Sequence, residues 1–271
     1  MVITPENSTD TLFNTCLFAA QCAGKYVYNR FNQAVTVDYK GKTNLVTQVD
    51  HKAEEMIISI IRDVFPDHRI LAEESPELVS DSPYRWIIDP LDGTTNFVHG
   101  VPIFSVSIAV EYQNEVYMGV VYDPCRQELF SAIKGHGAYL NKEAIRVSAT
   151  PSLIKSLTAT GFPYETDAIF DANMKIFRAV YKKSQGVRRG GSAALDLCYV
   201  AAGRFDGFWE FSLNPWDVAA GALLIMEAGG KVEDVYGQPF SIQNASRIVA
   251  TNGKIHCELK QLIENIYHKE K

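Results

Sequence analysis

The spacing of apolar residues predicts helices and strands in the first half of the chain. Asn, Ser, Thr and Asp at residues 7–10 suit a helix start, and apolar residues at helical spacing follow them and also follow Asp50. Because that period places apolar side chains on one face, we expect two amphipathic helices here. Short apolar runs between turn residues predict strands at residues 70–72, 86–88, 106–112, 115–122 and 129–133. Gln113 and Asn114 suit a hairpin turn between two of these strands.

The second half of the chain alternates strands with helices. Apolar runs predict strands at residues 156–160, 207–210, 231–235 and 247–251. Helical spacing predicts helices at residues 172–183, 192–202 and 217–228 and a last helix at the C-terminal end. A turn near residues 147–155 is the expected boundary between an N-terminal α+β subdomain, residues 1–150, and a C-terminal α/β subdomain, residues 151–271. The pattern indicates a mixed α/β class but does not define the layers.

Composition and charge narrow the class of protein and of partner. The chain has 271 residues, of which 46% are hydrophobic and 21% charged, so it should fold into one large domain or two subdomains. Its net charge is −6, and its basic residues form only short pairs such as Arg188 and Arg189. Non-specific nucleic-acid binding is therefore disfavoured. An anionic substrate would need local positive charge, which bound cations supply.

Cysteine usage and the N-terminal residues indicate a cytoplasmic protein. The five cysteines are scattered and include no C-x-x-C pair, so they resemble neither a disulfide framework nor a zinc site. Residues 1–7 lack the basic segment of a signal peptide. No apolar stretch approaches the roughly 20 residues that span a bilayer, so no membrane association is expected.

The segment at residues 86–97 carries the strongest indication of chemistry. Its apolar run ends in Asp89 and Asp92, which are followed at once by Gly93 and Thr94. Carboxylate oxygens suit hard cations such as Mg²⁺, and free backbone N–H groups at a helix start suit a phosphate. The ordinary alternative is an Asp-Pro turn followed by a helix cap, because Asp, Pro, Gly and Thr all favour turns. The rest of the chain has to decide between the two.

Three further segments supply the decision. Residues 216–221 place an aspartate at the head of an apolar helix, residues 72–75 carry an acidic pair after a strand, and residues 46–50 match a Val-Thr-x-x-Asp motif. With residues 86–97, the chain resembles the inositol monophosphatase family over most of its length. One departure is Asn44, where many members carry Asp. The resemblance implies a layered αβαβα sandwich, a homodimer and magnesium-dependent hydrolysis of a phosphate monoester.

The resemblance also implies a set of metal ligands, most of them in the N-terminal subdomain. Glu73, Asp89 and the main-chain carbonyl of Leu91 would hold one Mg²⁺, and Asp89, Asp92 and Asp217 would hold a second. A third ion would reach Glu73, counted among the catalytic residues, through water. Asp217 has an ordinary alternative role, since an aspartate at a helix start satisfies free N–H groups.

A second set of residues would act on the attacking water and the phosphate. The resemblance implies that Asp50 works with the hydroxyl of Thr94 to position and deprotonate water. Thr47 and Asp50 are also three residues apart, which is the spacing of a capping box. Gly93 and Thr94 would bind phosphate through backbone N–H groups, and Lys40 would reach the same region.

The alcohol part of the substrate would lie mainly against the C-terminal subdomain. The resemblance assigns it to Asp92, Gly191, Ser192, Ala193, Glu210 and Asp217. Residues 190–194 also have a simpler interpretation, a glycine turn into a closely packed helix, and Glu210 could be an ordinary edge-strand carboxylate.

The expected activity is hydrolysis of myo-inositol monophosphate to inositol and inorganic phosphate. Other catalytic motifs are missing: there is no G-x-x-x-x-G-K-[ST] loop and no G-x-S-x-G elbow. Two alternatives stay open. One is a relative that acts on fructose 1,6-bisphosphate, NADP or a 3′-phosphonucleotide, and the other is a binding protein for a macromolecular partner.

Overall fold

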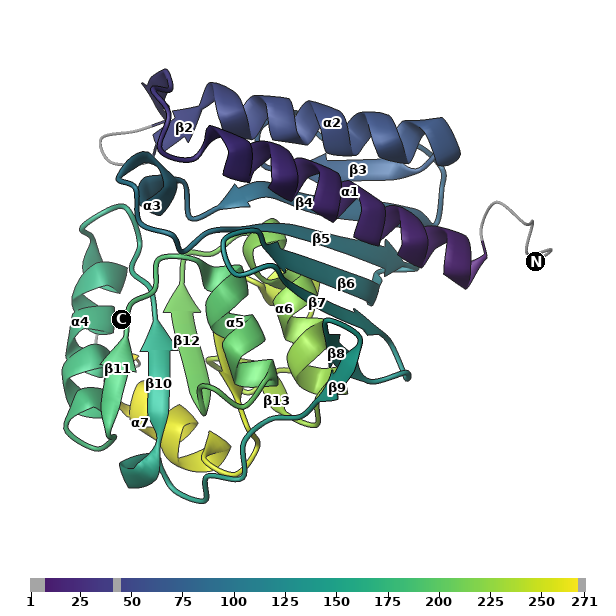
Figure 1. Ribbon diagram of the computed structural model, residues 1–271. Helices are drawn as coiled ribbons and strands as arrows, with labels where there is room; N and C mark the ends of the chain where they lie inside the picture. The colour runs from purple at the N-terminus through teal and green to yellow at the C-terminus, as the bar shows by residue number, and fades with distance from the viewer. Residues whose placement is uncertain (1–7, 41–44, 268–271) are drawn as a thin grey trace.

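A computed structural model describes residues 8–40 and 45–267. The helices and sheets form five layers, in which helix pairs alternate with two sheets (Figure 1). The expected αβαβα sandwich is therefore confirmed. Asn7 of the first cap and Asn44 of the expected loop lie outside the described residues. Among the described helices, none is long and apolar enough to cross a membrane.

The first sheet and its two covering helices come from the first part of the chain. Helices α1 (Thr9–Arg30) and α2 (Gln48–Val64) lie on its outer face, and β1 (Val37–Tyr39) pairs with β2 (Leu45–Thr47) beside them. The sheet has seven strands in sequence order: β3 (Arg69–Ala72), β4 (Tyr84–Asp92), β5 (Ser105–Tyr112), β6 (Glu115–Asp123), β7 (Glu128–Ile133), β8 (Ala138–Leu140) and β9 (Glu143–Ile145). Only the β3–β4 pair in it is parallel.

Strand β4 shows why this sheet is apolar on both faces. Trp86 and Ile88 pack into the core under α1 and α2, whereas Ile87 packs into the core on the other side of the sheet. Successive side chains of a strand point to opposite faces, so a strand covered on both sides has an unbroken apolar run. The expected hairpin is also confirmed, since Gln113 and Asn114 both have positive φ between β5 and β6.

The second sheet has five strands in the order β11 (Gly186–Arg188), β10 (Leu157–Thr160), β12 (Gly207–Phe211), β14 (Arg247–Thr251) and β13 (Lys231–Asp234). Helices α5 (Ala193–Ala201) and α6 (Pro215–Glu227) fill the layer between the two sheets. Helices α4 (Ala168–Tyr181) and α7 (His256–Tyr267) cover the outer face. Short helices complete the chain: α3 (Thr94–Val98), η2 (Leu153–Lys155) and η3 (Ile242–Asn244).

Small residues allow the central layer to pack closely. A Cβ on Gly119 of β6 would lie 2.9 Å from the Cα of Ala220 in α6, and one on Gly221 would lie 2.6 Å from the Cβ of Leu197 in α5. Larger side chains at these two glycines would force the helices and the sheet apart. Since α6 has neighbours on all sides, it is apolar around most of its circumference.

The structure corrects several element boundaries. Strand β4 continues to Asp92, four residues beyond the predicted end, and α4 begins at Ala168 instead of residue 172. Asp167 caps α4 by accepting hydrogen bonds from the backbone N–H groups of Ile169 and Phe170. The prediction did not include the three-residue strands β1, β2, β8, β9 and β11, which lack the apolar run that marked the predicted strands.

Candidate active site

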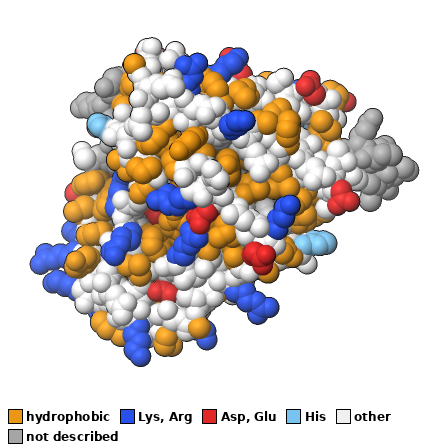
Figure 2. Space-filling view, viewed as in Figure 1, with side chains coloured by type: hydrophobic (Ala, Val, Ile, Leu, Met, Phe, Trp, Pro, Cys, Tyr) orange, Lys and Arg blue, Asp and Glu red, His pale blue; other side chains and the backbone are white. Residues whose placement is uncertain are grey.

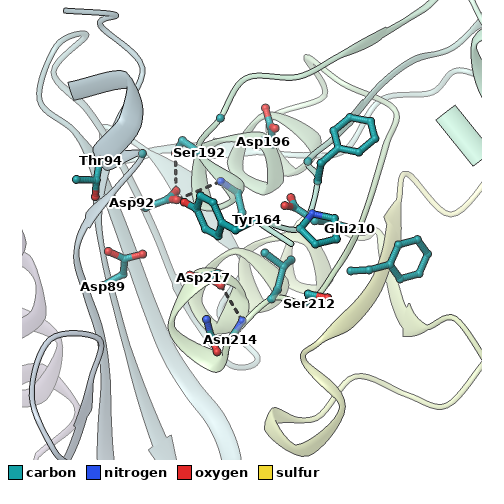
Figure 3. Close-up of a pocket in the computed structure, with 18 of the residues that line it drawn as sticks. Asp89, Asp92, Thr94, Tyr164, Ser192, Asp196, Glu210, Ser212, Asn214 and Asp217 are labelled. Atoms are coloured by element: carbon teal, nitrogen blue, oxygen red, sulfur yellow. Dashed lines mark hydrogen bonds between the residues drawn. The ribbon is translucent and has the colours of Figure 1, made fainter. Parts of the chain in front are cut away.

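One pocket gathers most of the residues to which the sequence motifs point. It has a volume of about 150 Å³ and lies where the end of β4 meets the starts of α5 and α6. Figure 3 shows Asp89 and Asp92 across this space from Asp217 and Glu210. The acidic residues that line the pocket are Glu73, Asp89, Asp92, Asp196, Glu210 and Asp217. The predicted site residues Leu91, Gly93, Thr94, Gly191, Ser192 and Ala193 line it too.

The end of β4 positions two of these carboxylates through a local irregularity. Pairing with β5 shifts register between Asp89 and Asp92, which is where Pro90 falls. A bulge tolerates a proline because the ladder is already interrupted there. Asp89 then accepts a hydrogen bond from the backbone N–H of Leu91, at 3.0 Å from Oδ1. Gly93 follows with φ of 99°, a left-handed conformation that lets the chain turn at once into α3.

Asp92 joins β4 to the start of α5. Its Oδ2 accepts hydrogen bonds from the Ser192 hydroxyl at 2.5 Å and from the backbone N–H of Ala194 at 2.8 Å. Burial raises the pKa of Asp92 to about 6, although these hydrogen bonds act in the opposite direction. The simpler interpretation of residues 190–194, a glycine turn into a helix, is confirmed, and this helix start also contacts Asp92.

Asp217 lies in the first turn of α6, where it also forms a cap. Its Oδ2 accepts a hydrogen bond from the backbone N–H of Asn214 at 2.7 Å, completing a capping box with Asn214. Burial raises the pKa of Asp217 well above its usual range, and the negative charges of Asp92 and Glu73 raise it further. Capping and participation in the acidic cluster therefore coexist in one side chain.

The donor set fits a hard cation in its chemistry. Burial raises the pKa of Asp89 well above its usual range, and the charges of Glu73, Asp92 and Asp217 add to this shift. Such mutual repulsion is what a bound cation relieves. Among residues 8–40 and 45–267, no three His, Cys, Asp or Glu side chains are arranged to hold a metal ion. In this structure Asp92 and Asp217 also accept hydrogen bonds from local donors, Asp92 from Ser192 and Ala194 and Asp217 from Asn214.

Asp50 reaches the pocket through Thr94. The Thr94 hydroxyl lies 2.9 Å from Oδ1 of Asp50 and 3.0 Å from the carbonyl oxygen of Leu91. The other oxygen of Asp50 accepts hydrogen bonds from the Thr47 backbone N–H and hydroxyl, at 2.9 and 2.6 Å. Asp50 is 1% exposed, so it contacts the pocket only through this neighbour. The expected capping box and the expected contact with Thr94 are both present.

Lys40 lies at the edge of the acidic cluster and is not part of the pocket lining. Its Nζ is 3.0 Å from Oε1 of Glu73 and 2.6 Å from Oε1 of Glu74. The backbone N–H of Glu74 in turn donates to Glu54 at 2.8 Å. Lys40 thus holds the acidic pair after β3 next to α2, and it contacts the expected metal ligand Glu73.

The far wall of the pocket contains residues that the sequence analysis missed. They are Gly161, Phe162, Pro163, Tyr164, Arg189, Asp196, Phe211, Ser212, Leu213 and Asn214. Asp196 is 4% exposed, and burial followed by the charge of Asp92 raises its pKa well above the usual range. The charge of Asp196 in turn adds to the burial that raises the pKa of Glu210 to about 8, while Arg189 opposes both shifts. Asp196 lies four residues after Ser192 on the predicted helix, a spacing that could have placed it near the site.

Gly161 makes room for Glu210, which gives a test of this wall. A Cβ at Gly161 would overlap the carboxyl group of Glu210, so Gly161→Ala should displace that side chain. We expect a loss of about 1–3 kcal/mol in unfolding free energy, the usual cost of overpacking, measured by urea denaturation. Gly135→Ala is the control, because nothing lies within 4 Å of its added Cβ and its cost comes from positive φ alone. An unfolding free energy of Gly161→Ala equal to that of wild type would contradict the close contact.

The raised pKa values predict how pH affects the stability of the metal-free protein. The pKa is about 6 for Asp92, about 7 for Glu74 and about 8 for Glu210, where burial is the largest cause each time. These pKa values exceed those of the same groups in an unfolded chain, so the folded state binds protons more tightly. Protonation of these groups therefore stabilises the fold fully below about pH 4, and this contribution is lost as pH rises toward 8. We expect the Tm in EDTA to fall by about 5 °C or more between pH 5 and pH 9. Saturating Mg²⁺ should reduce this slope, and a Tm in EDTA that is flat or rises with pH would contradict the assignment.

Comparisons with known proteins place the chain in a family. The model of the inositol monophosphatase family matches residues 9–268, so the chain belongs to that family. An inositol-1-monophosphatase of a Synechocystis species is 48% identical over 247 residues, covering 90% of this chain and 86% of the relative. The Nus factor SuhB of Pseudomonas aeruginosa is 44% identical over 260 residues, covering 93% and 96%.

Solved structures agree with this placement. The crystal structure of extragenic suppressor protein suhB from Bartonella henselae has a TM-score of 0.90 and 41% identity, covering 93% of this chain and 98% of that one. The relatives therefore share the fold over nearly the whole chain, but their names divide between a phosphatase and a Nus factor.

Proposed function

We propose that this chain is a Mg²⁺-dependent phosphomonoesterase that hydrolyses myo-inositol monophosphate to inositol and inorganic phosphate. The observation that carries the proposal is the hydrogen bond between buried Asp50 and the hydroxyl of Thr94, which lines an acidic pocket. The Synechocystis relative named inositol-1-monophosphatase supports the choice of substrate. Fructose 1,6-bisphosphate, NADP and 3′-phosphonucleotides are the alternative substrates.

Glu73, Asp89, the Leu91 carbonyl, Asp92 and Asp217 would hold two or three Mg²⁺ ions. When bound, Mg²⁺ supplies a lower pKa for water and neutralises charge on the phosphate and the leaving oxygen. The chain itself has only Arg189 as a cationic side chain among the described residues that line the pocket. A phosphate dianion among six acidic residues therefore needs cations from solution.

Thr94 and Asp50 would handle the proton of the attacking water. A water molecule next to the Thr94 hydroxyl would donate a hydrogen bond to the Thr94 oxygen, while the Thr94 hydroxyl donates a hydrogen bond to Asp50. As the water attacks, its proton would pass to Thr94 and the proton of Thr94 would pass to Asp50. Since Thr47 already donates two hydrogen bonds to the other oxygen of Asp50, the carboxylate is held in one orientation. The backbone N–H groups of Gly93 and Thr94 would bind the phosphate, and Lys40 would assist through its contact with Glu73.

The alcohol part of the ester would lie toward the far wall. Gly191, Ser192, Ala193 and Glu210 line the pocket together with Asp92 and Asp217, and these six residues would contact the alcohol part. Hydroxyl groups of inositol would exchange hydrogen bonds with the carboxyl group of Glu210.

A phosphate-release assay over a panel of esters tests the proposed substrate. The panel contains myo-inositol 1-phosphate, fructose 1,6-bisphosphate, NADP and a 3′-phosphonucleotide, each with Mg²⁺ and with EDTA. We expect the highest kcat/KM for the inositol ester and no release in EDTA. A higher kcat/KM for any other member would transfer the proposal to that substrate.

A second candidate function is that of a Nus factor with a macromolecular partner, which the 44% identical relative favours. Figure 2 shows Lys and Arg side chains gathered at the edge where α4 lies. Exposed Met174 and Tyr181 lie there beside Arg178 and Lys182, around one hollow of the surface. Such a role would not need the acidic pocket, so a protein with Asp89→Asn would keep it and lose the phosphatase activity.

Oligomeric state and location complete the proposal. We infer a homodimer in the cytoplasm from the family resemblance, with all five cysteines as free thiols. Light scattering after gel filtration measures the oligomeric state.

A further inference from the structure

Tyr164 is an exposed aromatic residue at a pocket that is otherwise lined by many polar groups. Its side chain is 58% exposed, yet it lines the same pocket as the acidic cluster. Figure 3 shows Tyr164 between Asp92 and Glu210, that is, between the acidic end of the pocket and the far wall. Partial burial and then the charges of Glu73 and Asp92 raise the pKa of Tyr164 to about 12, so its hydroxyl is near the cluster and stays protonated.

The segment that carries Tyr164 is fixed at its base. Asn173 of α4 donates a hydrogen bond to the Gly161 carbonyl at 2.6 Å and accepts one from the Trp209 indole at 2.8 Å. Gly161 follows β10, which pairs in parallel with β12, so it lies directly beside Glu210. The base of the segment is therefore held to both α4 and β12.

An aromatic contact fixes the next residue. Phe162 packs against Phe170 and Phe177 of α4, with ring centroids 5.8 and 5.9 Å apart. With Phe162 held by α4 and Gly161 held by Asn173, the position of Tyr164 two residues later is restricted. Tyr164 is thus an exposed side chain on an anchored support.

The chemistry around Tyr164 matches one class of alcohol. The carboxyl groups of Asp196 and Glu210 line the pocket and can exchange hydrogen bonds with hydroxyl groups, and Arg189 can donate hydrogen bonds to them. An aromatic face instead offers contact to C–H groups. A cyclic polyol bears hydroxyls at the edge of its ring and C–H groups on the face of its ring. It can therefore form hydrogen bonds to the pocket side chains and contact the aromatic face of Tyr164 at the same time, whereas an open-chain alcohol lacks a flat face.

We propose that Tyr164 determines specificity by packing its ring against the C–H face of a cyclic polyol, which holds the ester in front of Thr94. This inference rests on the proposed phosphatase function and adds the residue that distinguishes cyclic from acyclic esters. Tyr164 contacts the alcohol part alone, so it should affect substrate binding more than turnover.

The test compares two esters in four proteins. The esters are myo-inositol 1-phosphate, which is cyclic, and glycerol 2-phosphate, which is acyclic; the proteins are wild type, Tyr164→Ala, Tyr164→Phe and Tyr181→Ala. Tyr181 is the matched control, because it is 57% exposed and lies on α4 outside the pocket. We expect Tyr164→Ala to lower kcat/KM for the cyclic ester by roughly three- to tenfold through KM, the scale of one aromatic contact. Glycerol 2-phosphate should change by less than about twofold, and Tyr164→Phe and Tyr181→Ala should resemble wild type.

Calorimetric binding of both esters to Mg²⁺-loaded proteins that also carry Thr94→Ala, which slows turnover, separates this inference from the proposed activity. If wild type hydrolyses neither ester, the phosphatase proposal fails, and the binding data alone decide about Tyr164. Weaker binding of only the cyclic ester by Tyr164→Ala supports the inference in either case. Equal losses for both esters, no loss for either, or the same loss in Tyr181→Ala would overturn it.

Discussion

Asp89→Asn should lower kcat/KM for myo-inositol 1-phosphate by about 10³-fold or more. Asp89 is 2% exposed, and the other three acidic residues proposed as metal ligands all contribute to its raised pKa. Asp89 is the one anionic side chain that we assign to both metal ions, so its removal should weaken the binding of both ions. Stabilisation of a transition state by metal ions is worth several kcal/mol. Each 1.36 kcal/mol corresponds to a factor of ten in rate.

The same substitution should have the opposite effect on stability. Without metal, Asp89→Asn removes one of several repelling buried charges, so we expect a higher Tm than wild type in EDTA at pH 8. Saturating Mg²⁺ should raise the Tm of Asp89→Asn by less than it raises the Tm of wild type. Thermal unfolding in the two buffers, with circular dichroism as a check of folding, measures both effects. Parental turnover in a folded Asp89→Asn protein would show that Asp89 is not a ligand.

Asp50→Asn and Thr94→Ala should each lower kcat by about 10²–10⁴-fold, the usual contribution of a positioned base. Both residues are assigned to the attacking water, whose deprotonation belongs to the transition state, so KM should change little. Because the Thr94 hydroxyl and Asp50 are joined at 2.9 Å, they should act as one unit. The double variant is therefore expected to lose scarcely more activity than the worse single variant.

Steady-state kinetics of the three proteins check this expectation. Ser8→Ala is a suitable control: Ser8 caps α1 by accepting from the Thr11 backbone, so its loss should cost about 1 kcal/mol of stability and leave activity intact. If the losses in kcat multiply in the double variant, or if only KM rises, Asp50 and Thr94 do not share a proton path.

The layers of the fold became predictable only with the family resemblance. Helical spacing after Asp50 and the unbroken apolar run before Asp89 predicted α2 and β4 from local periodicity. Periodicity does not say which elements stack, because Ile87 and Ile88 are equally apolar but pack into different cores. The continuation of β4 to Asp92 was missed because Pro90 usually ends a strand, and here a register shift accommodates it.

The candidate site was predictable where residues share a motif and not where they meet through folding. Asp89, Asp92 and Thr94 are close in sequence, and the pocket contains all three. Asp196, Arg189 and Tyr164 reach it from α5, from the turn before α5 and from the segment after β10, and no local pattern connects them.

Release of inorganic phosphate from myo-inositol 1-phosphate during a Mg²⁺ titration of EDTA-stripped protein tests the central claim most directly. We expect no release above the uncatalysed background without metal and a saturable rise in rate as Mg²⁺ is added, which Asp89→Asn abolishes. Release that is independent of Mg²⁺, or its absence at every Mg²⁺ concentration in folded wild-type protein, would contradict the claim that the acidic pocket is a metal-dependent phosphatase site.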